Sequence, residues 1–309
     1  MRHRVVFAAN SNTVEGSGHL KRCIDFARTL DPQLFDCLFV GISETTWLNP
    51  LIAQFQREAY PLDKFVECDL LVLDTYQSPF IDHVLSKVRP KEILQIADPS
   101  TPLVKECKIL WLDTSLPPSS LTSRVVGSGL PFFPIRKIVS SPSPSRQAHN
   151  VVVVAGGTQQ VDVLEKLLFF LQIQKLHDIR FHILAEYSKK LPSSSNFFYY
   201  PIGPHLYSLM EFCDTAISSS GVGVWELIAN GINVGHFKFV SNQNSNFSYI
   251  SSNNLGVPLS SDGHNYSRDG LLKLLRDENT RSKLFFKGLN HVKVGGSSRV
   301  AELISSLCS

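Results

Sequence analysis

Short runs of apolar residues recur along the whole chain, and a helical pattern or a turn follows each of them. The runs lack alternation with polar residues, which is typical of strands buried on both faces of a parallel sheet. Their shortness and their Val and Ile content favour strands over pieces of buried helix. The strands expected from this pattern are Val5–Ala9, Cys37–Val40, Leu70–Leu73, Ile93–Ile96, Ile109–Leu112, Val151–Ala155, Phe181–Leu184, Ala216–Ile217 and Val234–Phe239.

Segments with helical periodicity lie between these runs. In the clearest of them, the apolar positions that share one face are Leu20, Cys23, Ile24, Ala27 and Leu30. The polar positions that fall on the other face are Lys21, Arg22, Asp25 and Arg28. This separation is typical of an amphipathic helix that covers a sheet. The alternation of strands with helices predicts a doubly wound α/β architecture.

The alternation breaks at Ser140–Ser145, a stretch of serine and proline that is typical of a linker. A new strand begins soon after it, and we therefore place a boundary near residue 146. We expect two Rossmann-like domains, residues 1–146 and residues 147–309. The last segment, Val300–Leu307, has a helical pattern and is expected to pack back on the N-terminal domain.

Composition excludes several classes of protein. The chain has 309 residues, of which 43% are hydrophobic and 18% are charged, so it can bury a large core. A net charge of +3 gives no reason to expect nucleic-acid binding. No apolar stretch approaches the ~20 residues of a membrane helix, and the apolar run near the N-terminus is too short for a signal peptide. We expect a soluble, cytoplasmic protein, either a monomer or a homodimer.

The six cysteines show neither C-x-x-C spacing nor a suitably spaced histidine. Zinc sites and disulfide frameworks are therefore poorly supported, and buried free thiols in a reducing cytosol are the better interpretation. We expect no metal and no other cofactor.

The first candidate site is a glycine-rich turn that contains Gly16, Gly18 and His19. It follows the first expected strand and Asn10, and a helix begins directly after it. Ligands of open α/β sheets bind at the carboxyl ends of strands, and a helix N-terminus there attracts oxyanions. A histidine in this position is suited to act as a general base. The alternative is an ordinary helix start with an incidental histidine. NAD binding is disfavoured because the third glycine of the dinucleotide fingerprint is missing.

The second candidate site lies in the C-terminal half, where Ser219, Ser220 and Gly221 form a small-residue loop before a helix. Free amides in such a loop suit a diphosphate, and the carboxylate of Glu226 could accept hydrogen bonds from ribose hydroxyls. The alternatives are a capping loop and an acid that favours the helix dipole.

Two more loops follow expected strands of the same half. One is glycine-rich and the other is amide-rich, which suits hydrogen bonding to a sugar or base, although an ordinary turn is the alternative. Their residues are Gly156, Gly157 and Thr158 in the first, and Asn242 and Gln243 in the second.

Taken in order, these motifs resemble those of the UDP-sugar hydrolases of pseudaminic acid biosynthesis. The motifs are Gly16-x-Gly18-His19, Leu73-Asp74-Thr75-Tyr76, Gly156-Gly157-Thr158, Ser219–Gly221 before Trp225-Glu226, and Asn242-Gln243. Such hydrolases release UDP from a diacetamido trideoxy sugar and are related to the inverting transferase that adds N-acetylglucosamine in peptidoglycan synthesis. The resemblance implies a metal-independent enzyme with the GT-B fold, in which two Rossmann-like domains face each other across a cleft.

The resemblance also implies roles for single residues. His19 would orient or deprotonate the nucleophile, Asp74 and Tyr76 would line the sugar, and Glu226 would hold the ribose. Ser219, Ser220 and Gly221 would bind the diphosphate.

Ala8 and Asn10 stand where these hydrolases usually carry Arg and Asp, so the identity of the acceptor stays open. The leading hypothesis is a hydrolase that releases UDP from an acetamido-type UDP-sugar in nonulosonic acid or surface glycan biosynthesis. One alternative is a glycosyltransferase that uses a UDP- or CMP-sugar. Another is a non-catalytic protein that binds nucleotide sugars.

Overall fold

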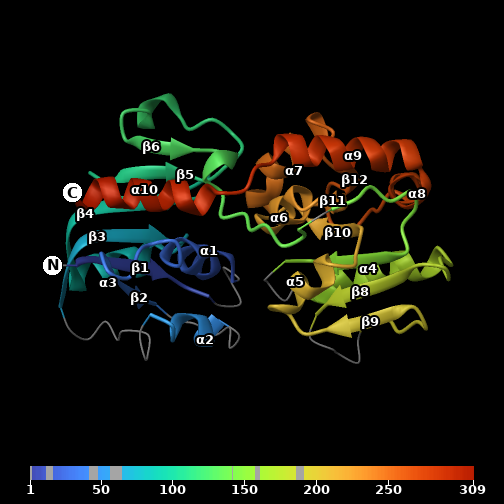
Figure 1. Cartoon of the computed structure of the whole chain (residues 1–309), viewed down its shortest axis with the longest axis horizontal. Coiled ribbons are helices and arrows are strands. Elements are labelled where there is room, and N and C mark those ends of the chain that lie inside the picture. The colour runs from blue at the N-terminus through green and yellow to red at the C-terminus, as the bar shows by residue number, and fades with distance from the viewer. Residues whose placement is uncertain are drawn as a thin grey trace. The chain divides into compact units, whose positions relative to one another are not determined.

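The computed structural model describes residues 2–11, 17–41, 48–55, 65–140, 142–156, 161–185 and 191–309. Contacts between residues divide the chain into two compact units (Figure 1). Unit 1 comprises Met1–Pro134 with Gly295–Ser309, and unit 2 comprises Ile135–Val294.

Unit 1 is built on a six-stranded parallel sheet with the strand order β2-β1-β3-β4-β5-β6. Its strands are β1 (His3–Ala9), β2 (Phe35–Val40), β3 (Val66–Asp74), β4 (Val88–Ala97), β5 (Lys108–Trp111) and β6 (Val125–Ser128). Its helices are α1 (Gly18–Ala27), α2 (Asn49–Ile52), α3 (Ser78–Lys87), η2 (Ser119–Leu121), η3 (Leu130–Phe132) and α10 (Gly296–Cys308).

The strand order of unit 1 places helices on both faces of the sheet. From β1 the chain crosses through α1 to β2 on one side, whereas from β3 it crosses through α3 to β4 in the other direction. Parallel crossovers are right-handed, so opposite directions put α1 and α3 on opposite faces. Ile81 and Val84 of α3 pack with Val6, Ala8 and Leu73 in one buried cluster.

Unit 2 is built on a second six-stranded parallel sheet with the strand order β12-β11-β10-β7-β8-β9. Its strands are β7 (Asn150–Val154), β8 (Arg180–Leu184), β9 (Phe197–Tyr200), β10 (Thr215–Ser219), β11 (Asn233–Phe237) and β12 (Val257–Ser260). Its helices are α4 (Val161–Ile173), α5 (His205–Met210), α6 (Gly223–Ala229), η4 (Ser241–Gln243), α7 (Asn244–Ser252), α8 (Arg268–Arg276) and α9 (Glu278–His291). The central strands and apolar faces of α4 and α8 share one core.

The predicted doubly wound α/β class is confirmed, and each expected apolar run lies in or overlaps a strand. The sequence pattern missed β6, β9 and β12, which are all edge strands of four residues. Edge strands are covered less completely than central ones, so they need no continuous apolar run.

The segment that links the two sheets is tied to unit 2. The side chain of Asn230, directly after α6, accepts hydrogen bonds from the backbone N–H groups of Ile138 and Val139 at 2.7 and 2.9 Å. It also donates to the carbonyl oxygen of Arg136 at 2.8 Å. These bonds explain why contacts group the residues from Ile135 onward with unit 2, whereas the boundary expected from the sequence lies near residue 146.

The last helix, α10, belongs to unit 1. It contacts α1 and β3, and its first residue, Gly296, lies directly against the backbone of Phe133. Arg299 donates to the carbonyl oxygen of Pro131 at 2.9 Å, and the backbone oxygen of Ser297 accepts from Thr29 at 3.1 Å.

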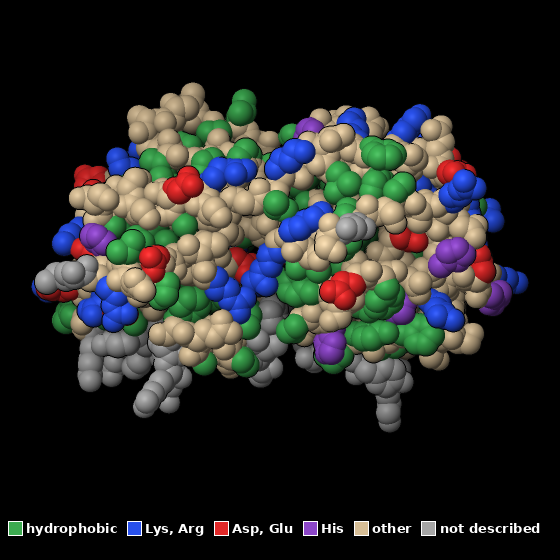
Figure 2. All heavy atoms as spheres, in the orientation of Figure 1, with side chains coloured by type: hydrophobic (Ala, Val, Ile, Leu, Met, Phe, Trp, Pro, Cys, Tyr) green, Lys and Arg blue, Asp and Glu red, His purple; other side chains and the backbone are tan. Residues whose placement is uncertain are grey.

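Within the part of the chain that the structure describes, no helix is long and apolar enough to cross a membrane. On the face that Figure 2 shows, Lys and Arg side chains lie singly or in small groups among other side chains. This distribution agrees with the small net charge of +3.

Gly296 offers a test of how α10 is attached. A Cβ atom at this position would lie 2.0 Å from the carbonyl oxygen of Phe133. We expect Gly296→Ala to lower the free energy of unfolding by about 1–3 kcal/mol, because overpacking outweighs the helix propensity gained. Denaturant unfolding measures this, with Ser298→Ala at an exposed position of the same turn as the control. Equal stability of the two variants would show that α10 is not held by this close approach.

Candidate functional site

The candidate site in unit 1 lies at the point where the strand order reverses. Ala9, at the end of β1, pairs with Asp74, at the end of β3, and the crossovers from these two strands leave in opposite directions. Ligands of open α/β sheets bind outside the carboxyl ends of strands at such a switch point. Asn10, which precedes the predicted glycine turn and which we count among the expected substrate-binding residues, follows β1 here and is buried.

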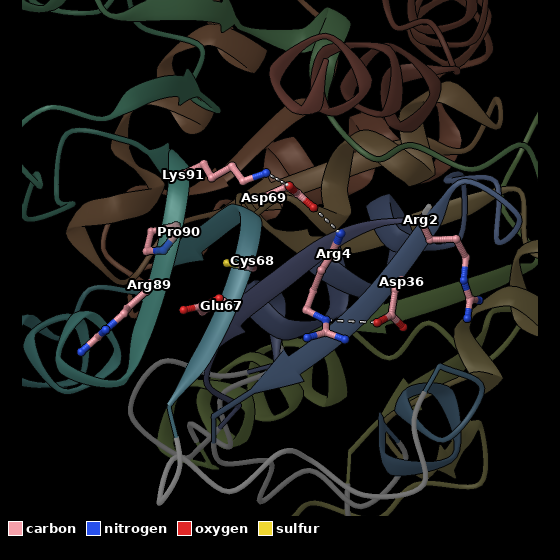
Figure 3. A pocket seen from close by; sticks show the side chains of 9 residues that line it. All are labelled: Arg2, Arg4, Asp36, Glu67, Cys68, Asp69, Arg89, Pro90 and Lys91. Carbon is pink, nitrogen blue, oxygen red and sulfur yellow. Dashed lines mark hydrogen bonds and ion pairs between the residues drawn. The ribbon is translucent and has the colours of Figure 1, made fainter.

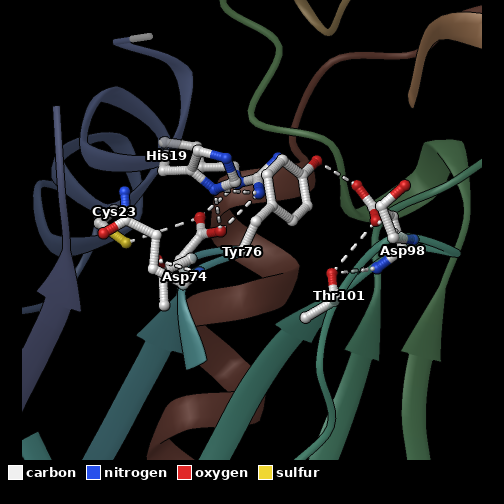
Figure 4. Close-up of polar contacts among 10 residues, drawn as sticks. His19, Cys23, Asp74, Tyr76, Asp98 and Thr101 are labelled. Atoms are coloured by element: carbon white, nitrogen blue, oxygen red, sulfur yellow. Dashed lines mark hydrogen bonds and ion pairs between the residues drawn. The ribbon is translucent and has the colours of Figure 1, made fainter. Parts of the chain in front are cut away.

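Three side chains form a buried polar cluster at this switch point. Nδ1 of His19, the second residue of α1, lies 2.6 Å from Oδ1 of Asp74. Arg22, one turn further along α1, forms an ion pair with the same carboxylate through Nε and Nη2. His19 is 5% exposed, Arg22 8% and Asp74 0%. Figure 4 shows Asp74 beneath the His19 ring, with Cys23 beside it.

The contacts of Asp74 fix the protons on His19. A carboxylate that pairs with a guanidinium is an acceptor, so Nδ1 of His19 carries the hydrogen and donates it to Asp74. Nη2 of Arg22 lies 3.0 Å from Nδ1, but a protonated Nδ1 cannot accept, so Arg22 acts on the carboxylate. In this tautomer Nε2 of His19 carries a lone pair, and no described residue forms a hydrogen bond with it.

Burial and charge oppose each other at Asp74. Burial alone would raise the pKa of this carboxyl group, but the charge of Arg22, the proximity of His19 and their hydrogen bonds outweigh it. They hold the pKa of Asp74 below its ordinary value of 3.8. Burial would likewise lower the pKa of Arg22, yet Asp74 raises it. Asp74 is therefore ionised at neutral pH and can orient His19, the arrangement of an acid–histidine pair in general-base catalysis.

The helical pattern placed Arg22 and Asp25 on the polar face of α1, but both are buried. Asp25 pairs with Lys21 one turn before it, and Arg22 pairs with Asp74 from the neighbouring strand. Buried charges persist where a partner compensates them, and the partner of Arg22 is distant in sequence. The spacing of three residues between His19 and Arg22, which places both on one helix face, is the signal that could have found Arg22.

Tyr76 and Asp98 extend the cluster along the sheet. The rings of His19 and Tyr76 meet edge to face, with centroids 4.5 Å apart and planes at 89°. The hydroxyl of Tyr76 donates to Oδ2 of Asp98, which follows the end of β4. Figure 4 shows Tyr76 between His19 and Asp98. The sequence singled out Tyr76 but not Asp98.

The predicted nucleotide loops of unit 2 lie at the second switch point, between β7 and β10. Gly156, just after β7, has φ +106°, and a Cβ atom there would lie 3.3 Å from Oγ of Ser219. The structure thus brings these two predicted residues side by side. Gly221 lies next to Ser219 as well, since its Cβ would lie 4.0 Å from the same Oγ. Two glycines around one serine hydroxyl allow a ligand to approach the backbone closely.

Ser220 faces away from a ligand in this loop. Its N–H and its hydroxyl both donate to the carbonyl oxygen of Phe237, at 2.8 and 3.0 Å. Its oxygen lies 3.1 Å from Nδ1 of His236, whose pKa burial lowers to about 3. Neutral His236 therefore donates from Nδ1 to Ser220. Ser219 has no such partner among the described residues, so it is better placed than Ser220 to bind a diphosphate.

The remaining predicted residues differ in their surroundings. Glu226 lies in the first turn of α6 and is buried. Gln243 is buried and its Oε1 accepts from the N–H of Phe239 at 3.1 Å, whereas Asn242 is exposed. Gly18 begins α1 in open space. Gly16, Gly157 and Thr158 lie outside the described residues.

A cavity of about 580 Å³ lies at the opposite, amino ends of β1 to β4 (Figure 3). Two ion pairs lie among its charged side chains, Arg4 with Asp36 at 3.2 Å and Lys91 with Asp69 at 2.7 Å. Exposed ion pairs of this kind contribute little to stability. Within the described ranges, no group of three or more His, Cys, Asp or Glu residues is arranged to hold a metal ion.

No protein-family model matches the sequence, and no curated protein matches it. Solved structures match nearly the whole chain. MurG from Acinetobacter baumannii has a TM-score of 0.64 and 13% identity, over 99% of this chain and 100% of that one. S. aureus MnaA, solved with UDP, has a TM-score of 0.67 and 9% identity, over 98% and 96%. The calicheamicin glycosyltransferase CalG4 has a TM-score of 0.60 and 14% identity, over 99% and 98%.

The chain has the GT-B fold. At these identities the likeness is one of fold, in which two Rossmann-like sheets follow each other along one chain. The expectation of two Rossmann-like domains from the strand pattern is confirmed at that level.

The buried charge of Asp74 makes stability depend on pH. Asp74→Asn leaves Arg22 buried without a counter-charge, and we expect it to lower the free energy of unfolding by about 3–5 kcal/mol near neutral pH. The folded pKa of Asp74 lies below 3.8, so its stabilising contribution is present above that pH and is lost as the pH falls further. Unfolding measured across the acid range should show the difference between wild type and variant shrinking.

Asp178→Asn is the matched control, because Asp178 forms an exposed ion pair with Arg276. We expect it to change stability by about 0–1 kcal/mol. A loss for Asp74→Asn as small as the control, or one that does not change with pH, would contradict the described role of Arg22.

Proposed function

We propose that this chain is a nucleotide-sugar-processing enzyme in which His19 is the general base. The observation that carries the proposal is the His19–Asp74 pair at the switch point of the first sheet. Asp74 accepts the hydrogen bond from the protonated Nδ1, so the lone pair lies on Nε2. The same carboxylate stabilises the imidazolium once Nε2 has taken a proton, as in other acid–histidine pairs.

The reaction that fits this arrangement is displacement at an anomeric carbon. Nε2 of His19 takes a proton from water, or from an acceptor hydroxyl, as that oxygen attacks. The bond between the sugar and the diphosphate breaks, and the nucleoside diphosphate leaves with the bonding electrons. The protein's part in the chemical step is to orient the nucleophile and to receive its proton.

Binding of the nucleotide is assigned to unit 2. The loops after β7 and β10 supply Gly156, Ser219 and Gly221 for the diphosphate, and Glu226 would accept from the ribose hydroxyls. MnaA, which shares the fold, was solved with UDP, and this favours UDP over CMP.

Within this class, we favour a hydrolase that releases UDP from an acetamido-type sugar, as in the pseudaminic acid hydrolases that the motifs resemble. A glycosyltransferase is the second candidate, because CalG4 of the same fold is described as one. The choice depends on whether water or a hydroxyl occupies the position beside Nε2. Retention of a complete acid–histidine pair argues against a purely binding protein. The expected cytoplasmic location and the monomeric or dimeric state stay predictions.

The deciding experiment is an incubation of the full chain with a panel of UDP- and CMP-sugars, with and without acceptor glycans. Release of nucleotide without an acceptor identifies a hydrolase, and release only with an acceptor identifies a transferase. Binding without release in either condition would sink the catalytic proposal and leave a binding protein.

His19→Ala tests the base directly. General-base catalysis typically contributes about 10²–10⁴-fold, so we expect turnover to fall by that factor while UDP affinity stays nearly unchanged. Turnover and melting temperature are measured on the same preparation. If His19 merely begins α1, the variant will lose stability and keep its turnover per folded molecule, and the assignment of the base is then wrong.

Glu226→Gln tests the nucleotide site. We expect it to weaken UDP binding by about 1–3 kcal/mol, because charged hydrogen bonds to the ribose become neutral and one acceptor is lost. Calorimetry on the full chain measures the change, with Glu211→Gln, at an exposed position after α5, as the control. Unchanged affinity in the Glu226 variant would show that this residue serves only its helix.

A further inference from the structure

The hydrogen bond between Tyr76 and Asp98 has a fixed direction. Oδ1 of Asp98 accepts from the N–H of Ser100 at 2.8 Å and from the hydroxyl of Thr101 at 3.1 Å. Thr101 has its hydrogen available for this because its oxygen accepts from the N–H of Asp98 at 3.0 Å. Oδ2 faces the hydroxyl of Tyr76. Figure 4 shows Thr101 and Tyr76 approaching Asp98 from different sides.

All of these partners of Asp98 are donors, so the carboxylate acts throughout as an acceptor. The single hydroxyl hydrogen of Tyr76 is therefore directed at Asp98. A phenol whose hydrogen is committed in this way can offer its oxygen only as an acceptor to a third group.

We propose that Asp98 is a positioning residue that makes the Tyr76 oxygen an obligate acceptor, so that the sugar held beside His19 must present an N–H or O–H donor there. The proposal rests on the proposed function, since it concerns the ligand of the same site. The group of the sugar that meets the Tyr76 oxygen is therefore an amide N–H or a hydroxyl, and not a carboxylate, an ether or a phosphate oxygen.

Tyr76 lies beside His19, so the acceptor character of its oxygen affects which ligand can bind there. Its ring contacts the His19 ring edge to face, and it is half-buried, so we expect a ligand that reaches His19 to contact Tyr76 as well. A sugar oxygen without a hydrogen would meet the lone pairs of the phenol. Burying two acceptors against each other without a hydrogen costs about 1–3 kcal/mol.

A second carboxylate, at the same edge of the sheet, hydrogen-bonds Ser115 and offers a matched control for Asp98. Asp113 follows the end of β5, next to β4, and is buried with its Oδ1 accepting from the N–H of Ser115 at 2.7 Å. Unlike Asp74, neither Asp98 nor Asp113 has an Arg or Lys partner among the described ion pairs.

Asp98→Asn reverses the direction of the hydrogen bond to Tyr76 with almost no change in the shape of the side chain. The donors of Ser100 and Thr101 require an oxygen at the Oδ1 position, so the amide NH₂ of the asparagine takes the Oδ2 position and points at Tyr76. The asparagine then donates, and the hydrogen of Tyr76 turns toward the ligand. Tyr76→Phe removes the oxygen altogether. Together with the variant that carries both substitutions, these proteins form a double-mutant cycle.

The first measurement is the affinity for UDP-N-acetylglucosamine and for UDP, by calorimetry on the full chain. We expect Asp98→Asn to weaken binding of the sugar nucleotide about ten- to a hundredfold and to leave UDP affinity unchanged. In the Tyr76→Phe background the same substitution should have no further effect. Asp113→Asn is the control and should match the wild type, because Asp113 makes no hydrogen bond to Tyr76.

Unchanged or tighter binding of UDP-N-acetylglucosamine by Asp98→Asn would overturn the inference and leave the proposed function intact. Failure of the wild type to bind UDP would instead count against the proposed function. The two failures are therefore distinguishable.

A second measurement needs no ligand. Burial and the charge of Asp98 raise the pKa of Tyr76. An amide donor in place of the carboxylate stabilises the phenolate, so Tyr76 should titrate at lower pH in Asp98→Asn. Ultraviolet difference titration at alkaline pH isolates this tyrosine when each spectrum is compared with the matching Tyr76→Phe protein. If Tyr76 ionises at no lower pH in Asp98→Asn than in the wild type, the hydrogen bond does not have the inferred direction.

Discussion

The ion pair between Asp74 and Arg22 is the interaction on which the candidate site depends. A fully buried carboxylate is tolerated only when charges and donors replace the water that it loses. Arg22 supplies the charge, and His19 supplies a further donor. The tautomer of the histidine and the position of its ring against Tyr76 both follow from that compensation. Without Arg22, the same carboxylate would favour a protonated form and could no longer hold the histidine in one state.

In each unit, hydrogen bonds within the protein hold several polar side chains at the switch point in one orientation. In unit 1, the donors around Asp74 and Asp98 fix the hydrogens of His19 and Tyr76. In unit 2, His236 and Phe237 hold Ser220, which leaves Ser219 between two glycines. Such preorganisation means that little reorganisation is needed when charge develops during a reaction.

The central strands were predictable because burial on both faces demands continuous apolar runs, as in Val151–Val154. The four-residue edge strands are less completely covered and do not need a continuous apolar run, and β12 even contains a proline. His19 was found because the glycine turn before α1 is a local feature. Arg22 and Asp98 were not, because their significance comes from partners 52 and 22 residues away. A charged residue one turn along an amphipathic helix looks solvated until the strand that carries its counter-charge is known.

The membership of α10 in unit 1 has a consequence for synthesis of the chain. Residues 295–309 are made after all of unit 2, so unit 1 stays without α10 until the synthesis of unit 2 is complete. During that interval the surface around Phe133 that receives Gly296 is uncovered. Domains usually fold as units in the order of their synthesis, N-terminal first. In this chain the second unit is complete in sequence before the first, and we therefore expect unit 2 to be able to fold before unit 1.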